Sequence, residues 1–378
     1  MNDGPAAGDG PPRATFGIDA RAAAEVPAGR GRVVRELLLA LAALDGEDRY
    51  VLYARSRPEL ELDARFRWKT VALPDPAWHV ATARLASGEC DAFLSTNSYL
   101  TSWFTRCPCA LVVYDLVPFV AGAHAQRRAA LIERATIDIG VRRAAALVCI
   151  SEATRRDLVA RIPSARRRAL VIPLAADARF GGPAATRQAA AVAVAHGIER
   201  PYVLAAGTLE PRKNLQRLLQ AWATLPHELR ATYELVLVGP TGWQAEEILC
   251  GANAAGIRLV GYVPDDELAA LYAGCELFCY PSLYEGFGLP VLEAMRAGAP
   301  VLTSNVSSLP EVAGNAAVLV DPLSVAAIRD ALSRLLGDPS ERERLRAAGL
   351  ARAAQFSWER TATRVRGILR ALRRREVA

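Results

Sequence analysis

The sequence predicts an α/β protein built from two doubly wound domains that face each other across a cleft. Short apolar runs alternate with helical stretches over residues 15–172, which is typical of a parallel sheet covered by helices on both faces. The same alternation restarts at residue 202, after a segment rich in Ala, Gly and Pro. The length of 378 residues also fits two domains of ordinary size better than one.

The first half begins with a predicted strand at Thr15–Asp19, a loop containing Gly29 and Gly31, and a helix with apolar residues at helical spacing. Further strands are predicted at residues 49–53, 68–73, 91–95, 110–113, 146–150 and 170–172. Functional groups in such sheets gather beyond the carboxyl ends of the strands, which makes Tyr114 and Asp115 candidates, with turn or capping roles as the alternative. Ser151 is expected to cap a helix.

The second half repeats this arrangement. Its strands are predicted at residues 202–206, 234–238, 258–260, 277–280, 301–303 and 318–320. Gly239 follows one strand, and Gly261, Tyr262 and Val263 follow another. These strand ends are suited to cradle a ribose and a flat base through backbone groups.

The strand at 277–280 leads through a turn with Gly286 and Gly288 into a helix whose first turn holds Pro290. The first amides of a helix lack internal partners and the dipole is positive there, so a phosphate can dock where glycines permit close approach. Glu285 lies before this helix and Glu293 lies within it. The two carboxylates can therefore bracket an elongated ligand. Two acceptors of hydroxyl hydrogens beside a phosphate site suggest a sugar nucleotide.

Residues 207–214 again follow a strand and precede a helix. Arg212 and Lys213 can reach a diphosphate there, Arg as a planar fork and Lys as a point charge. Cations at a helix N-terminus oppose the dipole and call for a compensating anion. The alternative is a basic helix start with Asn214 as its cap. Lys occurs elsewhere only at Lys69, so a Lys retained in this Arg-rich chain suggests a phosphate contact.

The composition argues against a nucleic-acid-binding protein, a disulfide framework and a zinc site. The net charge is +6, and positive side chains gather in several basic clusters. Such clusters can attract phosphates, lipid headgroups or nucleic acid, or they can simply be solvated. The clusters are residues 142–143, 155–156, 166–168 and 373–375. Without interleaved aromatic residues or a reading helix, nucleic acid is not an expected partner. The seven cysteines form no Cys-x-x-Cys pair, so neither a disulfide framework nor a zinc site is indicated.

No apolar run reaches the roughly 18 residues of a membrane span, and the N-terminus lacks the pattern of a signal peptide. A cytoplasmic location is therefore expected, with peripheral association at the inner face of the plasma membrane left open. The expected organisation is a disordered tail at 1–13, a first domain at 14–180 and a linker containing some helix at 181–200. A second domain follows at 201–356, and a helix at 357–378 is expected to pack back toward the first domain.

The stretch from Glu285 to Glu293, with its glycine turn, resembles the retaining glycosyltransferases of family four, as does the string at residues 207–214. Softer matches lie at residues 18–21, 113–118 and 150–155. Within that family the chain looks most like bacterial mannosyltransferase-type enzymes of polysaccharide and O-antigen assembly. The resemblance covers the chain from Thr15 to the final helix. It implies the GT-B fold of two Rossmann-like domains, a nucleotide-sugar donor as substrate, and no metal or other cofactor.

By position, the resemblance implies that Glu285 contacts the transferred sugar and Glu293 the ribose, while Arg212 and Lys213 neutralise the diphosphate. Tyr114 stands where relatives usually have His, and Tyr cannot carry a positive charge. Either its hydroxyl substitutes, or donor choice differs, or activity is reduced; His124 is a conceivable replacement. The catalytic set is thus Glu285, Lys213, Arg212 and Tyr114. The donor-binding set is Gly29, Gly31, Asp115, Gly207, Thr208, Gly239, Gly261, Tyr262, Val263, Gly286, Phe287, Gly288, Leu289 and Glu293.

The expected reaction moves a hexose to a saccharide or polyprenyl-linked acceptor. The first candidate donor is GDP-mannose, and the second is a UDP-sugar. The first domain is expected to hold the acceptor. Two alternatives remain open at this level. One is a nucleotide-sugar epimerase on the same scaffold, and the other is a catalytically impaired sugar-nucleotide-binding or scaffolding protein.

Overall fold

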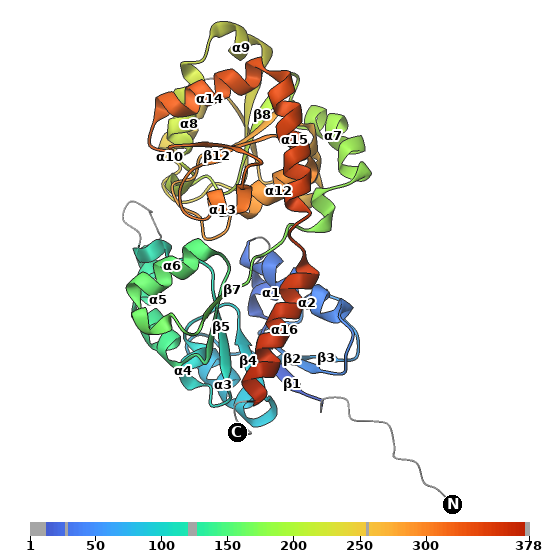
Figure 1. Ribbon diagram of the computed structural model, residues 1–378, viewed down its shortest axis with the longest axis vertical. Coiled ribbons are helices and arrows are strands. Elements are labelled where there is room, and N and C mark those ends of the chain that lie inside the picture. Colours follow the sequence, from blue (N-terminus) through green and yellow to red (C-terminus); the bar gives the residue numbers. More distant parts are fainter. Residues whose placement is uncertain (1–12, 27–28, 120–126, 255–256, 375–378) are drawn as a thin grey trace, which may run out of the picture.

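The computed structural model describes residues 13–26, 29–119, 127–254 and 257–374, which form two α/β domains stacked along the long axis of the molecule (Figure 1). The first holds a seven-stranded sheet in the order β3-β2-β1-β4-β5-β6-β7, and the second a six-stranded sheet in the order β10-β9-β8-β11-β12-β13. Neighbouring strands are parallel in both sheets. The prediction of two doubly wound domains is confirmed.

The strands of the first sheet are β1 (Thr15–Asp19), β2 (Arg49–Ala54), β3 (Phe66–Thr70), β4 (Ala92–Ser95), β5 (Cys109–Val113), β6 (Ala146–Cys149) and β7 (Ala169–Val171). Those of the second are β8 (Tyr202–Ala206), β9 (Glu234–Val238), β10 (Arg258–Gly261), β11 (Leu277–Tyr280), β12 (Val301–Ser304) and β13 (Val318–Val320). Every predicted strand is present. Only the third is displaced by more than one residue, from 68–73 to Phe66–Thr70, because it pairs with β2 and that strand ends at Ala54.

Helices cover both sheets. In the first domain they are α1 (Arg21–Glu25), α2 (Arg30–Ala43), α3 (Ala77–Glu89), α4 (Thr101–Phe104), α5 (Arg127–Arg143) and α6 (Glu152–Arg161). In the second they are α7 (Pro183–Ala195), α8 (Leu215–Ala223), α9 (His227–Thr232), α10 (Glu246–Ala254), α11 (Asp265–Gly274), α12 (Leu289–Ala297), α13 (Leu309–Ala313), α14 (Val325–Gly337) and α15 (Pro339–Ala353). Short 3₁₀ turns include η3 (Ala178–Phe180) and η4 (Pro211–Lys213).

The core of each domain lies between sheet and helices. In the first domain Ile18 is in register with Leu52 on one side and Leu94 on the other, and all three are fully buried in one cluster with Leu38 of α2. Burying each such side chain contributes about 1.5–3 kcal/mol. These central strands therefore fix the sheet edge from which the loops of the site extend.

The chain crosses between the domains twice. The first crossing follows β7. The second leads from α15 into α16 (Trp358–Arg374), which runs beside α2 of the first domain in Figure 1 and also contacts β4. Thr361 Oγ1 donates a hydrogen bond to the carbonyl of Pro173 at 2.7 Å, which ties the two crossings together.

Residues 181–200 are the segment predicted as a linker containing some helix. They contain α7, whose alanines Ala185, Ala189 and Ala193 are buried, and Ala185 and Ala193 belong to a core cluster with residues of α11. The segment therefore belongs to the helical layer of the second domain, because small residues at helical spacing let two helices approach closely. The predicted tail at 1–13 lies outside the described residues except for Arg13. Within the described residues no helix is long and apolar enough to cross a membrane.

Candidate active site

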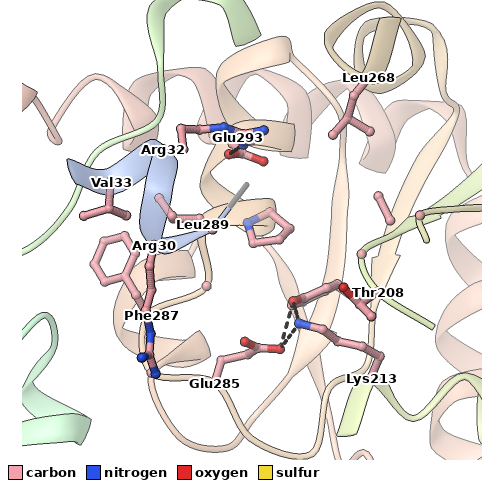
Figure 2. A pocket seen from close by; sticks show the side chains of 18 of the residues that line it. Arg30, Arg32, Val33, Thr208, Lys213, Leu268, Glu285, Phe287, Leu289 and Glu293 are labelled. Carbon is pink, nitrogen blue, oxygen red and sulfur yellow. Dashed lines mark hydrogen bonds and ion pairs between the residues drawn. The ribbon is translucent and has the colours of Figure 1, made fainter. Parts of the chain in front are cut away.

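A cavity of about 430 Å³ lies between the domains and is lined by residues of both. All but two of the residues predicted for the site line it, and the two exceptions are Gly31 and Gly261. Figure 2 shows Glu293 beside Arg32 at one place in the cavity and Glu285 beside Lys213 at another. The two carboxylates therefore do not pair with each other.

Gly31 and Gly261 have other roles. A Cβ on Gly31 would lie 1.7 Å from the carbonyl oxygen of Val26 and 2.7 Å from that of Ala22, so this glycine lets α2 pack against the segment that precedes it. Gly261 ends β10 with φ of +79° in open space, and is exposed. Neither glycine lines the cavity, and a contact of either one with the ligand stays a prediction. Gly29, with φ of +55° at the start of α2, does line the cavity.

The glycine turn after β11 is held from both domains. Gly288 has φ of +110° and precedes α12, whose second residue is Pro290, as predicted. The carbonyl of Gly286 accepts hydrogen bonds from Ser151 Oγ at 2.6 Å and Thr154 Oγ1 at 3.0 Å, both at the start of α6 in the first domain. Ser151 also caps α6 by accepting from the Thr154 amide, which confirms its predicted role. The first domain thus fixes the peptide between Gly286 and Phe287.

Glu285 is buried within a network of three donors. Its Oε1 atom accepts from Lys213 Nζ at 2.7 Å and from the Tyr280 hydroxyl at 2.8 Å, and its Oε2 atom lies 2.8 Å from Arg212 Nη1. Burial alone would raise the pKa of Glu285, but the charges of Arg212 and Lys213 outweigh it and lower this pKa to about 2. Glu285 is therefore a carboxylate held in a fixed orientation at neutral pH.

The two cations lie in η4, before α8 rather than in its first turn. Arg212 also pairs with Glu210 at 2.6 Å. The anions that compensate Arg212 and Lys213 are thus carboxylates of the protein, because the fold brings Glu285 and Glu210 against them. A bound anion is not needed to explain these cations. Their contact with a diphosphate remains a prediction.

Asn214 does not cap α8 with its side chain, although it occupies the position before that helix. Its Nδ2 atom donates to the carbonyls of Pro281 at 3.0 Å and Pro322 at 2.7 Å. Its backbone is left-handed, with φ of 60°. Asn214 therefore joins the η4 segment to the start of the glycine turn, which keeps the cations and Glu285 in one rigid unit.

Glu293 lies on α12 and is buried beside the first domain. Its Oε1 atom is 2.6 Å from Arg32 Nη1 of α2, and the other arm of Arg32 binds Asp265 at the start of α11. Burial raises the pKa of Glu293 to about 7, against the lowering effect of Arg32. This group of charges spans the cleft, so it joins the domains at the end of the cavity opposite Glu285.

Tyr114 lines the cavity from the first domain, and the guanidinium of Arg30 lies over its ring at 5.3 Å. Burial raises the pKa of Tyr114 above its usual value, so the phenol is a neutral hydrogen-bonding group at physiological pH. His124, the conceivable replacement for a histidine here, lies outside the described residues. In the described part of the chain, no three His, Cys, Asp or Glu side chains are arranged to hold a metal ion.

Comparison with known proteins places this site in a family. Residues 190–352 match the family profile described as Glycosyl transferases group 1. The second domain is therefore similar to group 1 glycosyl transferases over this segment. The matched segment contains Arg212, Lys213, Glu285 and Glu293, and all four line the cavity.

Two curated relatives carry the glycosyltransferase resemblance further. The chain is 51% identical over 167 residues to an O-antigen chain mannosyltransferase B of Escherichia coli, covering 43% of this chain and 44% of that protein. It is 33% identical over 221 residues to an MMP alpha-(1->4)-mannosyltransferase of Mycolicibacterium hassiacum, covering 57% of this chain and 51% of that protein. The matches thus span about half the length of these relatives.

The fold extends over the whole chain. It is similar to the structure of a sucrose-phosphate synthase from Thermosynechococcus elongatus, with a TM-score of 0.77 and 21% identity over 95% of this chain and 99% of that one. The two-domain arrangement around the glycosyltransferase domain is therefore the GT-B fold, as the resemblance implied.

The sequence reasoning missed several residues of the cavity, and four of them carry polar or charged side chains that bear on the site. Tyr280, Arg30, Arg32 and Asp265 all line the cavity. Tyr280 lies at the end of the apolar strand β11, so its pattern indicates only a core residue. Arg30 and Arg32 carry the signal that was used for Arg212, namely cations in the first turn of a helix, and the same argument applied to α2 would have found them.

Proposed function

We propose that this chain is a retaining glycosyltransferase that moves mannose from GDP-mannose to a saccharide or polyprenyl-linked acceptor. The observation that carries this proposal is the cavity between the domains, with an ionised Glu285 and a separate Glu293 at the glycine turn of a glycosyltransferase domain. The printed names of two relatives, both mannosyltransferases, support mannose as the sugar. An acceptor carried on a lipid implies action at the cytoplasmic face of the inner membrane, with peripheral attachment.

The proposed roles follow from charge. Breaking the bond between sugar and phosphate leaves positive character on the sugar and negative charge on the diphosphate. Glu285 would face the sugar as a fixed carboxylate. The diphosphate would face the backbone amides of residues 287–289, at the start of α12. It would also face those N–H donors of Arg212 and Lys213 that are not used in hydrogen bonds within the protein. Glu293 would take the ribose hydroxyls, in exchange for part of its contact with Arg32. No metal is required in this scheme.

Retention of the anomeric configuration is the expected stereochemical outcome. A double displacement needs a free nucleophile, whereas both oxygens of Glu285 are already engaged by Lys213, Tyr280 and Arg212. We therefore propose departure and attack on the same face of the sugar, with the leaving phosphate as base. Proton NMR of the initial product should show the α configuration of the donor, and a β product would refute the mechanism.

Nucleotide binding tests the diphosphate assignment. Replacing Lys213 or Arg212 by Ala is expected to weaken GDP binding by about 1.5–3 kcal/mol each, which is roughly ten- to 150-fold, because a charged contact is lost. Titration calorimetry with GDP, UDP, ADP and dTDP measures this and identifies the base.

The control is Lys69→Ala, which removes the other lysine of the chain, paired with Glu89 in the first domain. Unchanged GDP affinity in both Lys213→Ala and Arg212→Ala would refute the assignment. An epimerase would convert GDP-mannose without acceptor, and none of the relatives named above is an epimerase. An impaired binding protein would bind GDP but transfer no sugar with either Tyr114 or Tyr114→His.

A further inference from the structure

A second cavity, of about 350 Å³, lies where the two crossings between the domains run side by side. One wall is formed by residues 172–174 after β7, and the other by the end of α15 and the start of α16. The hydrogen bond from Thr361 Oγ1 to the carbonyl of Pro173 joins these walls. We call this second cavity the hinge cavity. Among the described residues, Leu174 is the only one that lines both the hinge cavity and the active-site cavity.

The hinge cavity is strongly basic. It is lined by Arg352, Arg360 and Arg364, and no Asp or Glu of the described residues lines it. Arg360 lies in the first turn of α16 (Trp358–Arg374), where the helix dipole is positive, and Arg364 lies one turn later. Cations are unfavourable at this end of a helix unless an anion lies beside them. Glu359, the acidic residue of the first turn, is exposed and does not line the cavity.

The arginines are arranged to receive a ligand. Arg352 is held by the carbonyls of Val312 at 2.9 Å and Glu311 at 2.6 Å, by the Gln355 side chain at 2.6 Å and by its position over the Phe356 ring. These hydrogen bonds use three of its five N–H donors and fix its plane.

The other two arginines have more donors left. The guanidinium of Arg360 donates one hydrogen bond within the described residues, to the carbonyl of Gln355. Arg364 is exposed and, within the described residues, has no hydrogen bond or ion pair. Most of the donors of the hinge cavity are therefore available to an anion.

We propose that the hinge cavity binds a phosphate-bearing small molecule. Guanidinium forks match phosphate oxygens in a bidentate way, which an ammonium cannot do. The volume falls within the roughly 300–1,000 Å³ of small-molecule sites, so it holds an organic group beside the phosphate. The occupant contacts both crossings and so fixes the angle between the domains, which couples this site to closure of the active-site cleft.

Calorimetric titration with inorganic pyrophosphate tests the hinge cavity independently of the proposed function. The double variant Arg360→Gln, Arg364→Gln is expected to weaken one class of pyrophosphate site at least tenfold. The matched control, Arg329→Gln with Arg344→Gln, removes two exposed charges elsewhere in the second domain and should change affinity by less than twofold. Lys213→Ala should leave the hinge class intact, because any binding that it removes belongs to the active-site cavity.

An equal loss of pyrophosphate affinity in the hinge and control variants would overturn the proposal. So would the absence of pyrophosphate binding, or binding that depends on Lys213 alone. Arg364→Gln alone should weaken binding about threefold or more. Because Arg364 has no side-chain partner among the described residues, the melting temperature of this variant should match that of wild type. Hydrogen exchange at residues 172–174 and 355–361 should slow with pyrophosphate in wild type, and not in the double variant.

Discussion

Replacing Glu285 by Gln should lower the rate of sugar transfer by about 100- to 1,000-fold, the range for losing one fixed electrostatic group in an active site. The amide has the same shape but no charge, so it cannot balance positive character on the sugar. It also leaves Lys213, which is bonded to Glu285 and Tyr280, without its carboxylate partner. Removing one member of a buried ion pair costs about 3–5 kcal/mol of folding free energy. Steady-state kinetics and thermal melts measure the two effects.

The pH dependence of stability provides a second check on Glu285. Its pKa is lowered from 4.5 to about 2 in the folded protein, so its contribution to stability is present above pH 4.5 and is lost as the pH falls toward 2. The difference in Tm between wild type and Glu285→Gln should therefore shrink over this range. Glu276→Gln, which removes the partner of Arg342 away from the cavity, is the control. Wild-type transfer by Glu285→Gln would contradict the role assigned to this carboxylate.

Gly286→Ala should also abolish most activity, for a steric reason. A Cβ at Gly286 would lie 2.0 Å from the carbonyl oxygen of Tyr114 and 2.9 Å from Cβ of Asp115. Both contacts are with the first domain, and the first is with backbone, so only separation of the domains relieves them. Misplacement of reacting groups by about 1 Å can cost roughly 100-fold in rate. We expect a loss of this size in kcat, and a larger radius of gyration by small-angle scattering.

The matched control is Gly337→Ala at the end of α14, where nothing lies within 4 Å of the new Cβ. The folding of the second domain itself should be retained in Gly286→Ala, because the clash is with the other domain. Normal transfer rates together with an unchanged radius of gyration would show that the turn tolerates a side chain, and that closure of the domains is not limited by Gly286.

The sequence by itself determined the architecture and most of the cavity. Central parallel strands are buried on both faces, so they appear as short apolar runs that a reader can locate without coordinates. Gly288 and Pro290 mark the start of α12 because their backbone preferences are local. Glu285 likewise lies beside the glycine turn because it directly precedes Gly286 in the sequence.

Only the tertiary structure decided which charges meet. Arg32 and Glu293 are 261 residues apart and form an ion pair because α2 and α12 face each other across the cleft. Lys213 and Glu285 are separated by 72 residues, and only the pairing of β8 with β11 brings their loops together. A helix dipole signals that an anion is needed but does not say whether the protein or a ligand supplies it. That depends on long-range packing, which the local sequence does not encode.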